Sequence, residues 1–231
     1  MTLRIIDEPA YRNRSLVFKD RLHAGDLLAS KLQDHIIRES AQLLAIPAGG
    51  VPVGYAVATR LSIPFDVVVV RKIQIPWNPE AGFGAIAWDG TVLLNEALVA
   101  QLGLSIELIR WCVSRTQETI HERLEKFRGD KPFPELKNKI VVFIDDGLAS
   151  GFTMLTAVKS VKKQKPEKII VAVPTASRSA AELVAPNVDK LICLNVRWGP
   201  IFAVADAYQE WYDLSDEEVM EFLGKVHGFK Q

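Results

Sequence analysis

The stretch VVFIDDGLASGFT, from Val141 to Thr153, decides the fold class of this sequence. It begins with a continuous run of apolar residues, which is typical of a strand buried on both faces of a parallel sheet. Two neighbouring aspartates, Asp145 and Asp146, end the run, and a loop of small residues follows. Because open α/β sheets bind ligands at the carboxyl ends of their strands, the stretch predicts both a strand and a site.

Similar apolar runs recur along the chain and alternate with helical patterns. The predicted strands cover residues 41–47, 65–70, 139–145, 168–174 and 189–195. The predicted helices cover residues 51–61, 153–164 and 177–185. This alternation predicts an α/β fold, a parallel twisted sheet flanked by helices with right-handed crossovers.

One region interrupts the alternation. Residues 73–87 contain two prolines and two glycines, which predict a long loop. Residues 85–94 predict a hairpin that turns at Asp89-Gly90, and a long amphipathic helix follows with Ser105 as its N-cap.

The last part of the chain leaves the strand pattern. It is rich in aromatic residues, and Ser215 and Glu218 have the spacing of a capping box at the start of a helix. We therefore predict a single domain over residues 1–231. Its core lies at about 18–195, and a small hood over the strand ends is formed by about 196–231 together with the N-terminal segment.

The composition restricts the possible functions. The 28 basic and 28 acidic side chains give a formal net charge of zero, which argues against a general nucleic-acid binder. The two cysteines and four scattered histidines form no disulfide framework and no metal-ligand spacing. Because no apolar run suits a signal peptide or a membrane span, we expect a cytoplasmic protein.

The loop after the aspartates is suited to an anion. It leads directly into a predicted helix, whose first N–H groups and dipole favour a phosphate. The residues of this loop are Ala149, Ser150, Gly151, Phe152 and Thr153. Since carboxylates accept strong hydrogen bonds from sugar hydroxyls, the aspartates and the loop together predict a site for a ribose 5-phosphate.

Three other motifs do not fit. The acidic strand of a P-loop NTPase requires G-x-x-x-x-G-K-[ST], which the sequence lacks. GLASG is G-x-x-S-G, whereas a nucleophile elbow requires G-x-S-x-G. GFGAIA follows a Pro-rich segment and precedes a hairpin signal, which is the wrong context for a dinucleotide-binding fingerprint.

The stretch resembles the signature of type I phosphoribosyltransferases, which is an apolar strand, two acidic residues, a loop of small residues and a Thr or Ser. The resemblance implies that Asp145 and Asp146 bind the ribose of phosphoribosyl pyrophosphate (PRPP), that Ala149 to Thr153 bind its 5-phosphate, and that Gly147 also belongs to the PRPP site. Gly147 departs from the family, which usually has an aliphatic residue there. FKDRLHAGDLLASKL, RKIQIPWNPEAGFGAIAWDG and YQEWYDLSDEEV look like one subgroup of predicted phosphoribosyltransferases without a defined acceptor.

The resemblance extends to other strand ends. PAGGVPVG (47–54) is similar to the family's pyrophosphate loop. That loop would comprise Ala48, Gly49, Gly50 and Val51. Arg71 and Lys72 would be catalytic cations that neutralise the leaving pyrophosphate, and residues 73–87 lie where the family has its flexible catalytic loop. The contacts of that loop would be Glu80, Gly82 and Gly84.

The implied reaction is a Mg²⁺-dependent displacement of pyrophosphate from PRPP by a nitrogenous, base-like acceptor. Asp145 and Asp146 would help to hold the Mg²⁺ through water or ligand oxygens. A planar acceptor would stack on Phe202, Tyr208 and Trp211 under the hood. No lysine in residues 174–180 is equivalent to the one by which some members read 6-oxopurines, which argues against a hypoxanthine or guanine acceptor.

The same fold also occurs in proteins that sense PRPP and regulate transcription without catalysis, and this is the alternative function. Type I members are commonly dimers, so the resemblance implies a homodimer. We expect no nucleic-acid or membrane partner.

Overall fold

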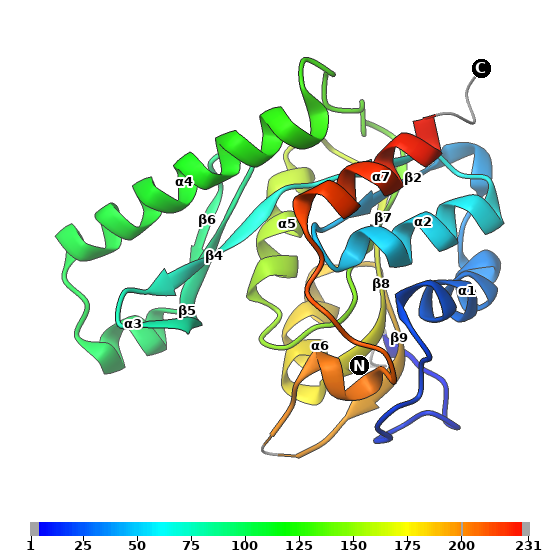
Figure 1. The fold of residues 1–231 in the computed structure, drawn as a ribbon, viewed down its shortest axis with the longest axis horizontal. Coiled ribbons are helices and arrows are strands. Elements are labelled where there is room, and N and C mark those ends of the chain that lie inside the picture. The colour runs from blue at the N-terminus through cyan, green and yellow to red at the C-terminus, as the bar shows by residue number, and fades with distance from the viewer. Residues whose placement is uncertain (1–4, 200, 228–231) are drawn as a thin grey trace.

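The computed structural model describes residues 5–199 and 201–227, with the backbone alone for Pro79 and Glu80. The strands are β1 (Ile5–Ile6), β2 (Ala41–Ala45), β3 (Phe65–Val67), β4 (Val70–Ile75), β5 (Asn78–Ala87), β6 (Val92–Leu94), β7 (Ile140–Ile144), β8 (Lys168–Ser177) and β9 (Lys190–Arg197) (Figure 1). The α-helices are α1 (Arg21–Leu32), α2 (Gly50–Leu61), α3 (Glu96–Leu102), α4 (Ile106–Arg128), α5 (Phe152–Lys162), α6 (Arg178–Val184) and α7 (Asp216–His227).

The main sheet has six parallel strands in the order β1-β9-β8-β7-β2-β3. Its strands are buried on both faces, because successive side chains point to opposite sides. On one face Leu43 and Val142 pack in the cluster that includes α1 and α2, and on the other Leu44 and Val141 pack in the cluster that includes α5 and α6. The predicted α/β fold with a parallel sheet flanked by helices is therefore confirmed.

The predicted strand over 65–70 is wrong at its end. β3 stops at Val67 and β4 starts at Val70, in a different sheet. The N–H of Val68 still bonds to the main sheet at the Ala45 carbonyl, whereas the Val69 carbonyl accepts from Trp88 N–H after β5. One continuous apolar run thus crosses between two sheets, and both environments bury it.

The prediction of a long loop over 73–87 is also wrong. These residues form the antiparallel strands β4 and β5, which turn at Pro76 and Trp77, and β6 completes a three-stranded sheet. Gly82 lies over the side chain of Lys72, where an added Cβ would come within 2.6 Å of Lys72 Cδ. The glycines therefore allow close approach within a strand, which their sequence pattern does not distinguish from a loop.

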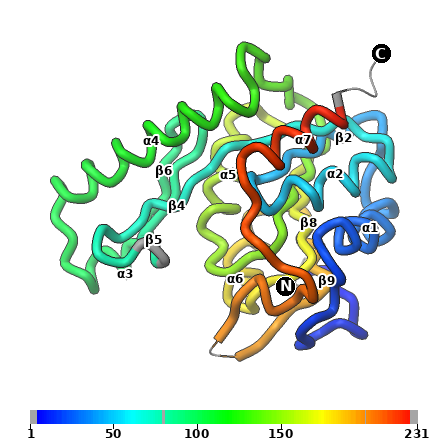
Figure 2. The backbone as a smooth tube through the Cα atoms, viewed as in Figure 1, coloured from blue at the N-terminus to red at the C-terminus, as the bar shows by residue number. Residues whose placement is uncertain are grey.

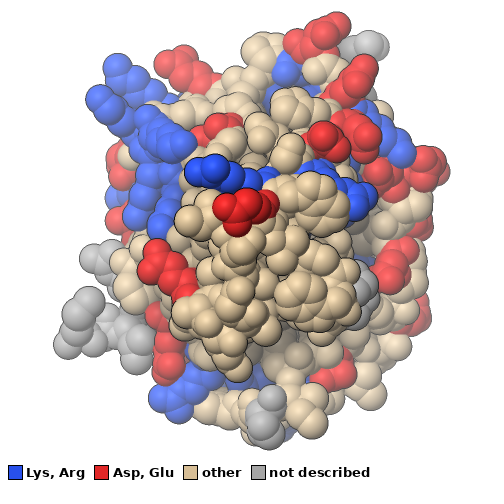
Figure 3. All heavy atoms as spheres, turned by 90° about the vertical axis from the view of Figure 1, so that its left-hand side faces the viewer, with Lys and Arg blue, Asp and Glu red and all other residues tan. Residues whose placement is uncertain are grey.

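The second sheet, α3 and α4 form an arm, residues 70–128, that projects from the main sheet (Figure 2). The predicted hairpin over 85–94 is confirmed, since Ala85 pairs with Leu93 and Ile86 with Val92. Figure 3 looks onto this side of the molecule and shows a broad area of uncharged side chains. The exposed large apolar residues of the arm are Trp77, Val92, Ile106 and Trp111.

The predicted helix starts are confirmed by their caps. Ser105 Oγ accepts the Leu108 N–H at 3.2 Å at the start of α4. At α7, Ser215 and Glu218 exchange hydrogen bonds of 2.9 and 3.2 Å, which is the geometry of a capping box. Among the described residues, no helix is long and apolar enough to cross a membrane.

The two ends of the fold meet beside the main sheet. Phe18 N–H donates to the Ala207 carbonyl at 2.9 Å, and the Phe18 carbonyl accepts from Gln209 at 2.8 Å. Glu210 N–H donates to the Lys19 carbonyl at 2.8 Å. The segment after β9 and the segment before α1 therefore run together, as the colours in Figure 1 show. The division of the chain into core and hood stays a prediction.

Candidate functional site

The acidic pair lies at the carboxyl end of β7, between β2 and β8. Asp145 Oδ1 accepts the backbone N–H of Asp146 at 2.9 Å. The Asp146 side chain is 14% exposed, so its carboxylate is held mostly within protein. The strand end therefore presents two fixed carboxylates rather than two mobile surface groups.

The loop after β2 packs directly on these carboxylates. A Cβ on Gly49 would overlap the Asp146 carboxylate and lie 2.5 Å from its Cγ, and one on Gly50 would lie 2.9 Å from Asp145 Cα. Real Cβ atoms do not tolerate such distances, so both positions require glycine for close approach. The structure thus brings together two of the predicted segments, the glycine pair and the acidic pair.

Within that loop, the four predicted residues differ in what they offer a ligand. Gly50 N–H donates to the Ile46 carbonyl at 3.1 Å, and Val51 N–H donates to the Ala48 carbonyl at 3.0 Å. The Val51 side chain is fully buried in the core. The backbone of Ala48 and Gly49 is therefore the part of this loop that is best suited to an anion.

The loop after β7 is fixed at one end and open at the other. Leu148 pairs with the end of β8, and Ser177 Oγ donates to the Ala149 carbonyl at 2.7 Å. Gly151 has a φ of +80° and precedes α5, which begins at Phe152. Ala149 and Ser150 are exposed, whereas Phe152 and Thr153 are half-buried. A helix start preceded by small exposed residues is the predicted phosphate cradle.

Gly147 has a specific packing partner. A Cβ on it would lie 2.7 Å from a Val204 methyl carbon and 2.9 Å from Thr175 Cγ2. Val204 lies in the segment after β9 and fills the space in which an aliphatic side chain at 147 would sit. The departure from the family pattern therefore coincides with a contact between the two segments.

Arg21 is a site residue that sequence reasoning missed. Its side chain is 7% exposed, and Nε donates to Asp146 Oδ2 at 3.0 Å. Nη1 donates to the Tyr212 carbonyl at 2.9 Å, and the guanidinium carbon lies 3.9 Å from the centroid of the Trp211 ring. The only local signal is Asp20, which caps the helix that Arg21 begins. The partner, Asp146, is 125 positions away, so spacing could not reveal the pair.

Burial controls the ionisation of the pair. Burial, together with the charge of Asp146, raises the pKa of Asp145 well above its usual range. Burial also raises the pKa of Asp146, although the nearby Arg21 guanidinium opposes the shift. The surroundings therefore disfavour the ionised forms of these two carboxyl groups, and a cation or donor hydroxyls would stabilise those forms.

The three aromatic residues predicted to stack on an acceptor have different environments. Tyr208 is 2% exposed, packs against Phe18 and Trp211, and donates its hydroxyl to the Asp146 carbonyl at 2.7 Å. Its ring faces protein, so the prediction that it stacks on a ligand is corrected to a supporting position. Trp211 is half-buried over Arg21, and Phe202 lies under Arg197 at 5.4 Å.

The predicted cations and loop residues lie on the arm. Arg71 and Lys72 belong to β4, and Glu80, Gly82 and Gly84 belong to β5. Burial, with a contribution from the charge of Arg123, lowers the pKa of Arg71, and Asp216 opposes this. Arg71 is therefore influenced by α4 and α7. The side chain of Glu80 lies outside the described residues.

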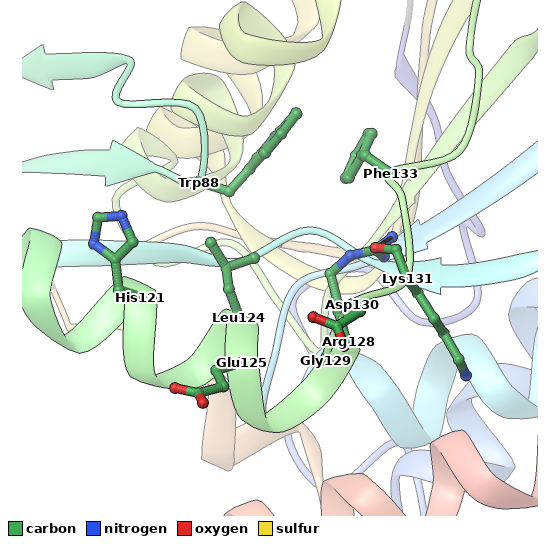
Figure 4. A pocket seen from close by; sticks show the side chains of 9 residues that line it. All are labelled: Trp88, His121, Leu124, Glu125, Arg128, Gly129, Asp130, Lys131 and Phe133. Atoms are coloured by element: carbon green, nitrogen blue, oxygen red, sulfur yellow. Dashed lines mark hydrogen bonds between the residues drawn. The ribbon is translucent and has the colours of Figure 1, made fainter.

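A hollow with a volume of about 620 Å³ lies elsewhere (Figure 4). It is lined by the stacked rings of Trp88 and Phe133, whose centroids are 4.1 Å apart, and by the C-terminal part of α4 with the loop that follows. None of the predicted site residues lines it. This hollow is therefore lined by residues other than those of the predicted site.

The fold defines an α/β protein in which glycine-containing loops after β2 and β7 surround an acidic pair. The model of the phosphoribosyl transferase domain family matches residues 19–207, which is most of the chain. The chain belongs to this family of transferases.

Two relatives extend the comparison. The chain is 34% identical over 211 residues to a Mycobacterium tuberculosis (strain CDC 1551 / Oshkosh) protein named "Putative phosphoribosyl transferase MT0597", covering 91% of the chain and 47% of that protein. The chain thus spans about half the length of this relative. The crystal structure of TT1426 from Thermus thermophilus is 33% identical, with a TM-score of 0.74, and the match covers 91% of this chain and 99% of that one.

Proposed function

We propose that this protein binds PRPP and transfers its phosphoribosyl group to a nitrogenous, base-like acceptor, releasing pyrophosphate. The observation that carries the proposal is the contact between Gly49 and the Asp146 carboxylate. This contact brings together two elements: a backbone loop that suits the pyrophosphate, and carboxylates that suit the ribose hydroxyls. In PRPP these groups lie on either side of C1, the ribose carbon that carries the pyrophosphate.

The roles follow from the chemistry of each segment. The loop 149–153 at the start of α5 holds the 5-phosphate through N–H groups and the helix dipole. Asp145 and Asp146 accept hydrogen bonds from the ribose hydroxyls. The bond from C1 to the pyrophosphate oxygen breaks, the bond from C1 to the acceptor nitrogen forms, and the acceptor loses a proton. Catalysis then depends on positioning and electrostatics.

A Mg²⁺ ion is part of the proposal. Among the described residues, no group of three or more His, Cys, Asp and Glu side chains could hold a metal. Two buried carboxylates with raised pKa values still fit an ion that takes its remaining ligands from substrate oxygens and water, which is how Mg²⁺ is commonly bound. When bound, Mg²⁺ would neutralise developing negative charge on the leaving pyrophosphate.

The acceptor, the arm and the assembly complete the proposal. A planar acceptor stacks on Phe202 or Trp211, while Arg71 and Lys72 of the arm neutralise pyrophosphate. A homodimer is supported by the exposed apolar side chains of the arm, since large apolar surfaces often mark interfaces. Sedimentation equilibrium of the protein would test this, with a monomer at micromolar concentration contradicting it.

The central test is calorimetric titration with PRPP and Mg²⁺, followed by an assay of pyrophosphate release with a panel of bases and amines. We expect saturable binding and release with at least one acceptor. Binding without release for every acceptor would favour the PRPP-sensing alternative. An absence of binding would contradict both functions.

A variant separates the acidic pair from the fold. Asp145→Asn together with Asp146→Asn removes both charges at nearly constant volume, and we expect PRPP binding to be lost while the fold is retained. Circular dichroism and thermal unfolding provide the control for folding. An unchanged affinity would contradict the ribose assignment.

A further inference from the structure

Arg21 joins three parts of the molecule that are distant in sequence. It begins α1, it donates to Asp146 after β7, and it contacts Trp211 and Tyr212 after β9. We propose that Arg21 is a positioning residue that couples the ribose-binding carboxylates to the segment 208–212, here called the strap. The proposal rests on the proposed function, because it assigns PRPP to those carboxylates.

The strap contacts the acidic pair at two points. Tyr208 donates its hydroxyl to the Asp146 carbonyl at 2.7 Å, and Arg21 bridges the Asp146 carboxylate to the Tyr212 carbonyl with bonds of 3.0 and 2.9 Å. Backbone and side chain of one aspartate are therefore held by opposite ends of the strap. The guanidinium also covers the Trp211 ring at 3.9 Å, within the range of a cation–π interaction.

The position of Arg21 at the start of α1 is fixed by its surroundings. Arg21 is the first residue of α1, whose N-cap Asp20 accepts the His23 N–H at 2.8 Å. Just before it, Phe18 and Lys19 are hydrogen-bonded to Gln209 and Glu210 of the strap. Arg21 is also 7% exposed, so its side chain has little free space in which to reorient.

The Asp146 carboxylate is confined from the opposite side by Gly49. The Asp146 carboxylate thus lies between the Arg21 guanidinium and the loop that we assign to pyrophosphate. A ribose hydroxyl that donates to this carboxylate would share it with Arg21, so ribose binding would alter the environment of the guanidinium and of the Trp211 ring against which it packs.

The test compares affinity with a signal from Trp211. PRPP with Mg²⁺ should change the tryptophan emission of the wild-type protein, and Trp211→Phe should abolish that change. Arg21→Met should raise the Kd for PRPP about tenfold, the loss expected for one charge-assisted hydrogen bond, and should also abolish the Trp211 signal. Arg21→Lys should recover part of the affinity, because it restores the charge without the forked geometry.

Arg197→Met is the matched control. Arg197 lies over Phe202 and bonds to Asp206 at 3.3 Å, so it makes a similar contact in the same part of the chain without reaching Asp146. This variant should keep the wild-type PRPP affinity and the Trp211 signal. Calorimetry gives the affinity and circular dichroism verifies folding.

Each outcome decides the proposal. If Arg21→Met keeps both affinity and signal, the coupling is refuted. If the wild type binds PRPP without any Trp211 response, the coupling fails while the proposed function stands, and if the wild type does not bind PRPP, both fail. If Arg21→Met does not fold, Arg21→Lys decides. Wild-type affinity and signal in that variant would refute the proposal that the forked guanidinium couples Asp146 to the strap.

Discussion

The glycine pair after β2, at the carboxyl edge of the main sheet, and the turn glycines Gly90 and Gly103 of the arm serve different purposes. Gly49 and Gly50 have ordinary φ values, and an added Cβ at either would collide with the acidic pair. Gly90 and Gly103 of the arm have φ values of +81° and +60°, with nothing within 4 Å of an added Cβ. The pair after β2 therefore needs glycine for space, whereas the two turn positions need it for backbone conformation.

The largest effect is expected from Gly49→Ala. Its Cβ would displace the Asp146 carboxylate or the loop itself, so we expect the Kd for PRPP to rise at least about 100-fold, or about 2.7 kcal/mol. Calorimetric titration measures this. Gly224→Ala in α7 is the matched control, because nothing lies within 4 Å of the added Cβ. That control should keep the affinity; equal losses in both variants would remove the distinction.

Gly147→Ala tests the need for space at another crowded glycine, with the free energy of unfolding as the measured quantity. Contacts of 2.7 to 2.9 Å with Val204 and Thr175 should lower the free energy of unfolding by about 1–3 kcal/mol. Chemical denaturation measures the loss. Adding Val204→Ala should make room and recover part of it, which a double-mutant cycle would quantify. Strictly additive effects would contradict direct packing between Gly147 and Val204.

The acids of the two regions should also respond differently to pH. Burial, together with the charge of Asp146, raises the pKa of Asp145, so this carboxyl group is protonated at a higher pH than a free aspartate, and we expect PRPP affinity to fall as the pH is lowered. At Asp89 in the arm burial opposes the shift, but hydrogen bonds from Lys163 and Thr91 lower the pKa. Its contribution to stability is therefore present above its unfolded pKa and lost only as the pH falls through the lower folded value.

The variant Asp145→Asn separates the titration of Asp145 from the titration of PRPP itself. Asp145→Asn should have a smaller pH slope of affinity than the wild type, measured by calorimetry at several pH values. Because a raised pKa means that the ionised carboxylate destabilises the folded protein at neutral pH, this variant should also unfold at a higher temperature without ligand. Equal slopes would show that the ligand alone titrates.

The smallest effect is expected from Gly103→Ala. With a φ of +60° at the end of α3, alanine should cost about 1–2 kcal/mol of stability and leave PRPP affinity unchanged. Gly103→Asn should cost less, because asparagine tolerates the left-handed region. Thermal unfolding measures the difference, and a loss of PRPP affinity would show that the arm conformation reaches the site.

The main sheet was predictable because its strands are buried on both faces, which leaves continuous apolar runs such as residues 140–144. The arm was not, since β5 contains a proline and two glycines, a composition typical of a loop, whereas the two glycines allow close packing within a strand. The end of the 65–70 run was missed because Val67 and Val70 are equally buried in different sheets.

The candidate site was predictable where chemistry is local in sequence. The acidic pair and the loop to Thr153 adjoin one another, and the glycine pair follows its own strand. Arg21 could not be found in this way, because its contacts with Asp146 and Tyr212 span 125 and 191 positions. The buried role of Tyr208 was likewise set by distant partners, since its hydroxyl bonds to the Asp146 carbonyl.

The pairing of residues 16–19 with 206–210 has a consequence for synthesis on the ribosome. Phe18 and Arg21 emerge early, yet their partners follow almost two hundred residues later. Contacts of such separation form late, after the sheet between them. A nascent chain that stops before Tyr208 would carry all the strands that the structure describes and both loops, but the carboxylate of Asp146 would have no connection to a strap.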